Sequence, residues 1–97
     1  MRITVLVDFQ NDFVDKALGF PGAEKLDAPI AARLRENFAN GDYFVQTNDT
    51  HGTDYMNTRE GKNLPVMHCG YGTHGWKTYG VTNDVIEDII KHARCYI

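Results

Sequence analysis

The feature that most constrains the fold is a run of five residues, Ile3-Thr4-Val5-Leu6-Val7, which leads directly into Asp8. Its β-branched and aliphatic residues favour a strand that is apolar on both faces. Continuous runs of this kind are typical of strands buried on both sides, as in parallel sheets covered by helices. The sequence therefore predicts an α/β protein in which residues 3–7 form a central strand.

The pattern downstream alternates between helix and strand. Asp27-Ala28-Pro29 resembles a helix start, with a capping aspartate and an early proline, and Asn40-Gly41 resembles its end. Residues 43–45 open a second strand that runs towards Asp49. A second helix is expected from about Thr82, and residues 94–97 look like the start of a third strand. This order predicts a parallel sheet with right-handed crossovers.

Each predicted helix has one apolar face. In the first, the apolar side chains are Leu26, Ile30, Ala31, Leu34 and Phe38. In the second, they are Val85, Ile86, Ile89, Ile90 and Ala93, while Glu87, Asp88 and Lys91 face water. Residues 10–22 are expected to form a loop. Residues 50–82 lack periodicity, and a loop of that length in a compact domain is usually functional or disordered.

Two carboxylates follow the predicted strands. Asp8 and Asp49 both come at strand carboxyl ends, which is where parallel sheets bind their ligands. A carboxylate at the lip of a buried strand is partly desolvated, which suits Asp8 to proton transfer. The alternative is that Asp8 is a loop aspartate that accepts hydrogen bonds from nearby backbone N–H groups.

The long loop gathers groups that can bind a metal. Asp49 and His51 lie two residues apart, on one side of an extended segment, and His68 can supply a third ligand. Two histidines and one carboxylate with open positions are typical of a catalytic site, and zinc, iron and manganese are all compatible. The alternative is a set of unrelated polar residues. A structural zinc site that adds Cys69 and His74 fits no known spacing, because His68 and Cys69 are adjacent.

The two cysteines are weak candidates for a nucleophile. Cys95 lies in an apolar strand pattern and is expected to be an inert core thiol. Cys69 has no lysine or arginine close in sequence to stabilise its thiolate. His74 and His92 are expected to face solvent.

Composition bounds the partners and the location. The net charge of −3, with no basic run, argues against a nucleic-acid partner. No apolar stretch approaches the ~20 residues of a membrane helix, and the first residues do not resemble a signal peptide. Two cysteines form no disulfide framework, so a cytoplasmic location is expected.

Three stretches, in order along the chain, resemble the isochorismatase-like cysteine hydrolases, and within them the metal-containing nicotinamidase branch. They are "VLVDFQNDFVDKALGFPGAEKL", "FVQTNDTH" and "TREGKNLPVMHCGYGTHGW". The first stretch resembles the opening strand and the aspartate loop of that family. The second stretch resembles its Asp-x-His metal motif, and the third resembles a segment of its small hydrolases. Together they span residues 3–76.

The resemblance implies a three-layer α/β/α parallel sheet of Rossmann-like type and a small-molecule amide substrate. It implies that Asp8 handles the proton of an Asp-Lys-Cys triad and that Phe13 lines the substrate pocket. It also implies that Asp49, His51 and His68 ligate a divalent metal, with zinc expected first. Glu60 lies close enough in the pattern to join the metal shell, but it is not expected to be a ligand. In that mechanism a cysteine thiolate attacks the carboxamide, and water hydrolyses the thioester.

The chain departs from the family pattern at its end. Ile97 comes before the places of the triad lysine and the nucleophilic cysteine, so the chain is expected to be an incomplete, amino-terminal half with about three strands, two helices and one long site loop. In the order 3-2-1 the first strand lies at an edge, which is a pairing hazard. Either a missing half or a second copy of the chain is expected to pair with residues 3–7. A non-catalytic metal-binding module and an assembly-dependent interaction domain are the alternative functions.

Overall fold

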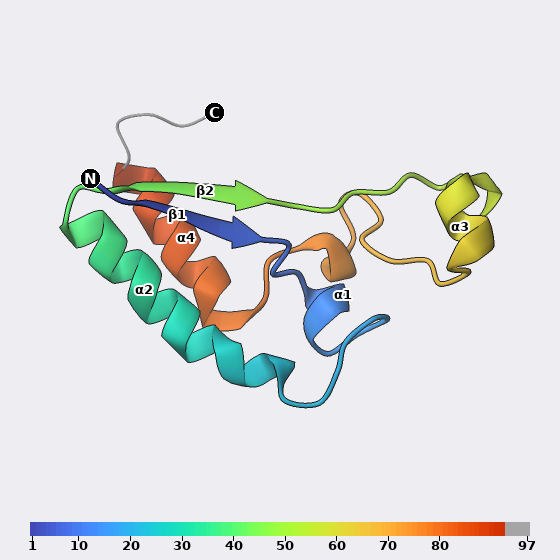
Figure 1. The fold of residues 1–97 in the computed structure, drawn as a ribbon, viewed down its shortest axis with the longest axis horizontal. Coiled ribbons are helices and arrows are strands. Elements are labelled where there is room, and N and C mark those ends of the chain that lie inside the picture. The colour runs from blue at the N-terminus through green and yellow to red at the C-terminus, as the bar shows by residue number, and fades with distance from the viewer. Residues whose placement is uncertain (93–97) are drawn as a thin grey trace.

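The structure is a computed structural model, and it describes residues 1–92 of the chain (Figure 1). Its elements, in order, are strand β1 (Ile3–Val7), helices α1 (Asn11–Val14) and α2 (Asp27–Ala39), strand β2 (Tyr43–Thr47), and helices α3 (Arg59–Asn63) and α4 (Gly80–His92). Short 3-10 turns at Ala23–Leu26, Tyr55–Asn57 and His74–Trp76 connect them. The third strand predicted at residues 94–97 lies outside the described residues.

The two described strands form a parallel sheet. β1 pairs with β2 from Ile3 opposite Tyr43 to Val7 opposite Thr47, so both strands end at the same edge. This confirms the predicted α/β class and the parallel direction. It also places the residues that follow both strands side by side, which is what a shared site requires.

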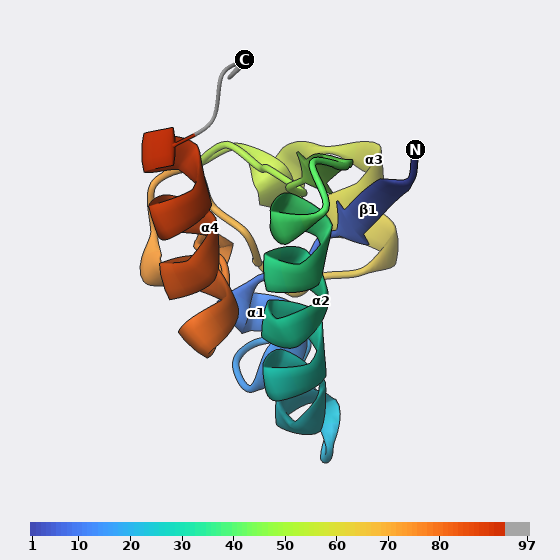
Figure 2. The same ribbon diagram turned by 90° about the vertical axis from the view of Figure 1, so that its left-hand side faces the viewer.

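Helices α2 and α4 pack against each other and cover one face of the sheet (Figure 2). Leu34 of α2 is 1% exposed, and Leu6 of β1 is buried beneath the two helices. The predicted stripe of α4 is confirmed, since Val85, Ile86 and Ile89 are buried and Ile90 is partly buried against the same core. The stripe predicted for the first helix is wrong at both ends: Leu26, which precedes α2, and Phe38 are 50% and 42% exposed. The predicted stop of α2 is confirmed as well, because Gly41 takes a left-handed φ of 71° as the chain turns into β2.

Asp27 does not cap its own helix, which corrects the sequence prediction. Its carboxylate instead accepts the N–H groups of Val81 and Thr82, at 2.9 Å each, in the first turn of α4. The Thr82 hydroxyl donates in return to the Asp27 carbonyl, at 3.1 Å. The 3-10 turn before α2 runs straight into that helix, so the carboxylate is free to stabilise the neighbouring helix instead.

The outer face of the sheet is uncovered in the described part of the chain. Its apolar side chains are between 48% and 66% exposed: Ile3, Val5, Val7, Tyr43 and Val45. Helices of the described chain cover only one face of the sheet. The prediction that residues 3–7 are buried on both faces is therefore wrong for the described part of the chain. Of the three layers expected, the described residues form two. A groove of about 230 Å³ lies between β1 and α2, and most of its lining residues are apolar, with Thr4 and Arg33 as the polar ones.

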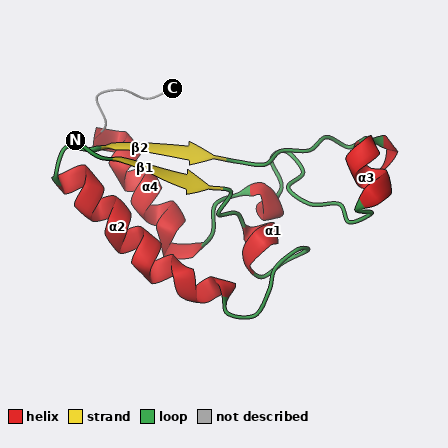
Figure 3. Cartoon of the chain, viewed as in Figure 1, coloured by secondary structure: helices red, strands yellow, loops and turns green. Residues whose placement is uncertain are grey.

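Two segments expected as loops contain short helices. Residues 11–14 form α1, and the segment after β2 holds α3 and two 3-10 turns within a long connection (Figure 3). Helices of four or five residues are too short to show a periodic apolar pattern. Within residues 1–92, every helix falls short of the length and apolar character needed to cross a membrane.

Candidate functional site

Asp8 sits where β1 ends, in a left-handed conformation with φ of 51°. Its N–H donates to the Thr47 carbonyl at 3.1 Å, and the Thr47 hydroxyl donates to its carboxylate oxygen Oδ1 at 2.7 Å. Aspartate tolerates this conformation better than most side chains do, and backbone strain of this kind clusters at functional sites. The end of β2 therefore orients the Asp8 carboxylate.

The long loop folds back beside the end of β2. The His51 N–H donates to the Cys69 carbonyl at 2.9 Å, and the Tyr71 N–H donates to the His51 carbonyl at 3.0 Å. These two bonds form a parallel bridge between His51 and Gly70. Two segments almost twenty residues apart are thus held together, and the bridge brings His68 next to His51.

His68 is buried at 3% exposure and its ring is fixed by the backbone. Its Nδ1 lies 2.7 Å from the Val66 carbonyl, so this nitrogen carries the proton and donates it. That tautomer leaves Nε2 with a free lone pair. A hydrogen bond of this kind on the second ring nitrogen is the usual companion of a metal-binding histidine.

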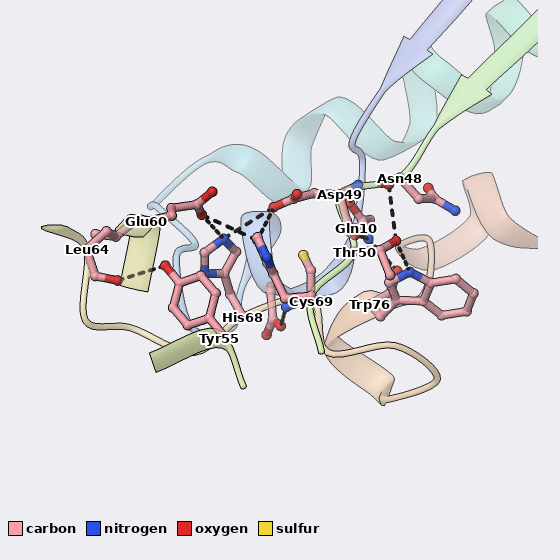
Figure 4. A network of polar contacts seen from close by, with 12 residues as sticks. Gln10, Asn48, Asp49, Thr50, Tyr55, Glu60, Leu64, His68, Cys69 and Trp76 are labelled. Atoms are coloured by element: carbon pink, nitrogen blue, oxygen red, sulfur yellow. Dashed lines mark hydrogen bonds and ion pairs between the residues drawn. The ribbon is translucent and has the colours of Figure 1, made fainter. Parts of the chain in front are cut away.

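The three predicted metal ligands meet in one cluster. Figure 4 labels two of them, Asp49 and His68. Oδ2 of Asp49 lies 3.1 Å from Nε2 of His51 and 3.3 Å from Nε2 of His68. The three candidate donor atoms all lie within 4.8 Å of one another. Among the described residues, this cluster includes neither Cys69 nor His74, so the structural zinc alternative gains no support.

Glu60 lies beside this cluster, although the three residues whose donor atoms all lie within 4.8 Å of one another do not include it. Its Oε2 lies 3.3 Å from Nε2 of His51 and 3.7 Å from Nε2 of His68. The short helix α3 carries it there, and the Thr58 hydroxyl starts that helix by accepting the Gly61 N–H at 3.1 Å. A capping threonine two residues before a glutamate is the local sequence signal for the position of Glu60.

The separations between these donor atoms suit one small cation. A tetrahedral ion with bonds of about 2.0–2.1 Å holds its ligand atoms ~3.3 Å apart. Four of the nitrogen–oxygen distances in the cluster run from 3.1 to 3.7 Å. Two imidazoles and two carboxylates form a donor set that zinc, iron and manganese accept. The residues present therefore fit a divalent metal.

Aromatic side chains surround the two histidines. The Tyr55 ring lies 4.6 Å from the His51 ring and 5.2 Å from the His68 ring, between centroids, and its hydroxyl donates to the Leu64 carbonyl at 2.7 Å. Burial, with Glu60 and Asp49 nearby, raises the pKa of Tyr55. The Phe13 ring packs edge-on against His68 at 5.6 Å. Phe13 thus lies at the cluster, and its role in lining a substrate pocket stays a prediction.

Cys69 is held in the site by its backbone, and its thiol is closed off. It is fully buried and has a φ of 49°, and its N–H donates to the Asp12 carboxylate at 2.7 Å. Burial, together with the negative charges of Asp49, Asp12 and Asp8, raises the pKa of the Cys69 thiol to about 12. A thiol in this state is protonated near pH 7 and is a poor nucleophile.

Iodoacetamide is expected to leave Cys69 unmodified in the folded chain at pH 7.5, because the thiol is both buried and protonated. Peptide mapping by mass spectrometry assigns the label to each cysteine separately. The same chain in 6 M guanidinium is the control, where Cys69 is expected to react fully within minutes. Rapid labelling of folded Cys69 would show that the site opens to solvent.

Comparisons with known proteins agree with this architecture. No protein-family model matches the chain, and no curated protein matches it. Among solved structures, a nicotinamidase from Bacillus subtilis is 30% identical, with a TM-score of 0.79, over 95% of this chain and 50% of its own. A pyrazinamidase/nicotinamidase from Streptococcus mutans is 28% identical, with a TM-score of 0.83, over 95% of this chain and 52% of its own.

A third structure is the pyrazinamidase of Pyrococcus horikoshii in complex with zinc, which is 28% identical with a TM-score of 0.69. It is matched over 78% of this chain and 43% of its own. The chain thus spans about half the length of the structures that it matches. Identity of 28–30% together with these TM-scores goes beyond a shared fold class. Fold and sequence together confirm that this chain resembles the isochorismatase-like superfamily, and within it the nicotinamidases and pyrazinamidases.

Proposed function

We propose that this chain carries the metal centre and the proton-handling aspartate of a hydrolase that cleaves the C–N bond of a small amide. The observation that carries the proposal is the cluster of Asp49, His51 and His68, whose donor atoms lie within 4.8 Å. The similarity to nicotinamidases supports the reaction class. The zinc in the Pyrococcus horikoshii structure makes zinc the first candidate for the metal.

Each residue has a distinct task in this proposal. Asp49, His51 and His68 hold the ion, and Glu60 supplies a fourth ligand from α3. When bound, the metal supplies a Lewis acid and a template for water or substrate. Asp8 takes the proton of the attacking thiol and returns it to the leaving amine, and the Thr47 hydroxyl fixes the orientation of its carboxyl group. The Phe13 ring forms part of the wall against which the substrate lies.

The first test is the metal content of the purified chain by elemental analysis. One divalent metal per chain is expected, and Asp49→Ala and His51→Ala are each expected to lose it, because two or three remaining ligands hold zinc weakly. His74→Ala is the matched control: it removes a histidine of the same loop whose side chain is exposed. Metal lost equally in all three variants, or absent from the parent chain, would contradict the proposed site.

A non-catalytic metal-binding module is the second candidate function. The closed, protonated thiol of Cys69 favours it, because the described residues then offer no cysteine ready for attack. The two candidates differ in a simple assay on pyrazinamide and related small amides. Turnover that survives Cys69→Ala places the nucleophile outside the described residues. Metal binding without turnover by any assembly of the chain favours the module.

A further segment is expected to cover the exposed outer face of the sheet. Sheets made of parallel strands are covered by helices on both faces, whereas residues 1–92 leave the outer face and one edge of β1 open. The occupant we propose is a segment of the same fold that supplies further strands, helices, and the triad lysine and cysteine. The matched structures, about twice as long as this chain, support that choice. A cytoplasmic location and the absence of nucleic-acid partners stay predictions.

The 97-residue chain alone is expected to self-associate, because the same face can pair with a second copy. Sedimentation velocity at 5–50 μM is expected to give a species larger than a monomer. Val5→Lys is expected to shift it towards monomer, since Val5 is central on the outer face and 54% exposed. Lys62→Ala, on α3 and away from the sheet, is the control. A well-behaved monomer at all concentrations would contradict self-association.

A further inference from the structure

Gln10 is a polar side chain buried at the point where the sheet ends and the site begins. It follows β1 by three residues and is 0% exposed, although it carries an amide with two donor positions and one acceptor. Burying such a group is costly unless it is hydrogen-bonded. The hydrogen bonds that Gln10 makes therefore indicate what holds it in place.

The Gln10 amide bonds to both backbone groups of Asp49. Its Oε1 accepts the Asp49 N–H at 2.9 Å, and its Nε2 donates to the Asp49 carbonyl at 2.9 Å. Backbone pairing between the strands ends just before, where the Asp8 N–H donates to the Thr47 carbonyl. The glutamine side chain thus takes the place of a neighbouring strand and pairs Asp49 as a peptide group would.

A third bond ties this pair to a distant part of the chain. Nε2 of Gln10 also donates to the Trp76 carbonyl at 2.7 Å, across 66 residues. Within residues 1–92, the backbone of Asp49 makes its hydrogen bonds to Gln10 alone. One side chain therefore fixes the backbone from which the Asp49 carboxylate reaches the two histidines (Figure 4).

We infer that Gln10 is a positioning residue for the metal centre, acting through the backbone of Asp49. This inference rests on the proposed metal-binding function. Asp49 contributes the oxygen shared by both histidines, at 3.1 and 3.3 Å, so a rotation of its backbone separates that oxygen from both nitrogens. Groups that orient ligands in this way change metal affinity by about 10- to 100-fold when they are removed.

The test uses Co²⁺ as a spectroscopic probe, with two variants and one matched control. Gln10→Met keeps the volume and removes all three hydrogen bonds. Gln10→Glu keeps the shape and the acceptor, but turns a carboxylate oxygen towards two carbonyl groups. Gln46→Met is the control, because Gln46 is a partly buried glutamine of β2 whose amide bonds to Thr78 at 2.6 Å and leaves Asp49 alone. Circular dichroism reports folding for each variant.

The expected result is a loss of Co²⁺ affinity of at least 10-fold in both Gln10 variants, with a changed visible absorption spectrum. Gln46→Met is expected to bind within about 2-fold of the parent. A role of Gln10 in stability alone would lower the melting temperature and leave affinity and spectrum unchanged. Folded Gln10 variants that bind Co²⁺ as the parent does would overturn the inference.

The hydrogen-exchange rate of the Asp49 amide is a second test, which needs neither folded variants nor bound metal. In the metal-free parent chain this amide is expected to be protected, because it is bonded to a buried acceptor. Rapid exchange of the Asp49 amide would overturn the Gln10 inference by itself. Protection without any Co²⁺ binding would leave the positioning contact in place and contradict the proposed metal site instead.

Discussion

Asp27→Ala is expected to lower the free energy of unfolding by about 3 kcal/mol, a large share of the ~5–15 kcal/mol typical of a domain. The change removes the carboxylate that accepts the N–H groups of Val81 and Thr82, and Thr82 is fully buried. Each orphaned buried N–H costs about 1–3 kcal/mol, and the loss of a cap costs ~1 kcal/mol. Thermal unfolding is expected to shift by more than 10 °C, at ~4–8 °C per kcal/mol.

The control for Asp27→Ala is Asp84→Ala, which removes an exposed carboxylate near the start of the same helix. It is expected to change stability by less than ~0.5 kcal/mol. Asp27→Asn keeps one acceptor oxygen, so its loss of stability is expected to lie between those of Asp27→Ala and Asp84→Ala. Equal melting temperatures for the parent chain and Asp27→Ala would show that α4 does not depend on this cap. Because α4 packs against α2 and both helices cover the sheet, this cap also stabilises the sheet whose edge carries the site.

Glu60→Ala is expected to weaken zinc binding by about 100-fold while leaving the fold intact. Its carboxylate oxygen Oε2 lies 3.3 Å from Nε2 of His51, where it could complete the ligand set of a zinc ion, yet the side chain is about half exposed. The exposure means that little packing is lost with it. Competition against a colorimetric zinc chelator at constant pH measures the change in affinity.

Glu60→Gln separates charge from shape, because the amide oxygen remains a weak ligand; an intermediate affinity is expected. Arg59→Ala, which changes the neighbouring residue of the same short helix, is the matched control and is expected to leave affinity within ~2-fold. Zinc affinity unchanged in Glu60→Ala would limit the metal shell to Asp49, His51 and His68. That outcome would restore the simpler expectation for Glu60 drawn from the sequence.

Local patterns explain which parts of the fold were predictable. The strand at residues 3–7 and the two main helices depend on patterns within a few residues, and all three appear in the structure. The predicted apolar face of α2 is confirmed only in part, because Ala31 and Leu34 are buried whereas Phe38 is 42% exposed. The position of Asp8 and Asp49 at one edge of the sheet also followed from local information. Parallel strands have their carboxyl ends at one edge, so the residues after them must be neighbours.

Other features depend on which segments meet, and no local pattern encodes that. The Asp27 carboxylate bonds to residues about 54 positions away, and Gln10 bonds to Trp76 across 66 positions. Glu60 reaches the histidines because a five-residue helix, too short to show periodicity, turns it towards them. The helix α1 was not predicted because it is also too short to show periodicity. The open outer face of the sheet was not predicted because it depends on which segments pack against the sheet.

Local sequence patterns alone predict the α/β class, the parallel strands, the two main helices, and the edge at which Asp8 and Asp49 lie. Secondary structure follows periods of two and of about 3.6 residues, which a sequence displays directly. Three contacts depend instead on tertiary packing: Glu60 lies beside His51, Asp27 caps α4, and Gln10 holds the backbone of Asp49. Those contacts form only when distant segments pack, because hydrogen-bond geometry must be satisfied across the finished fold.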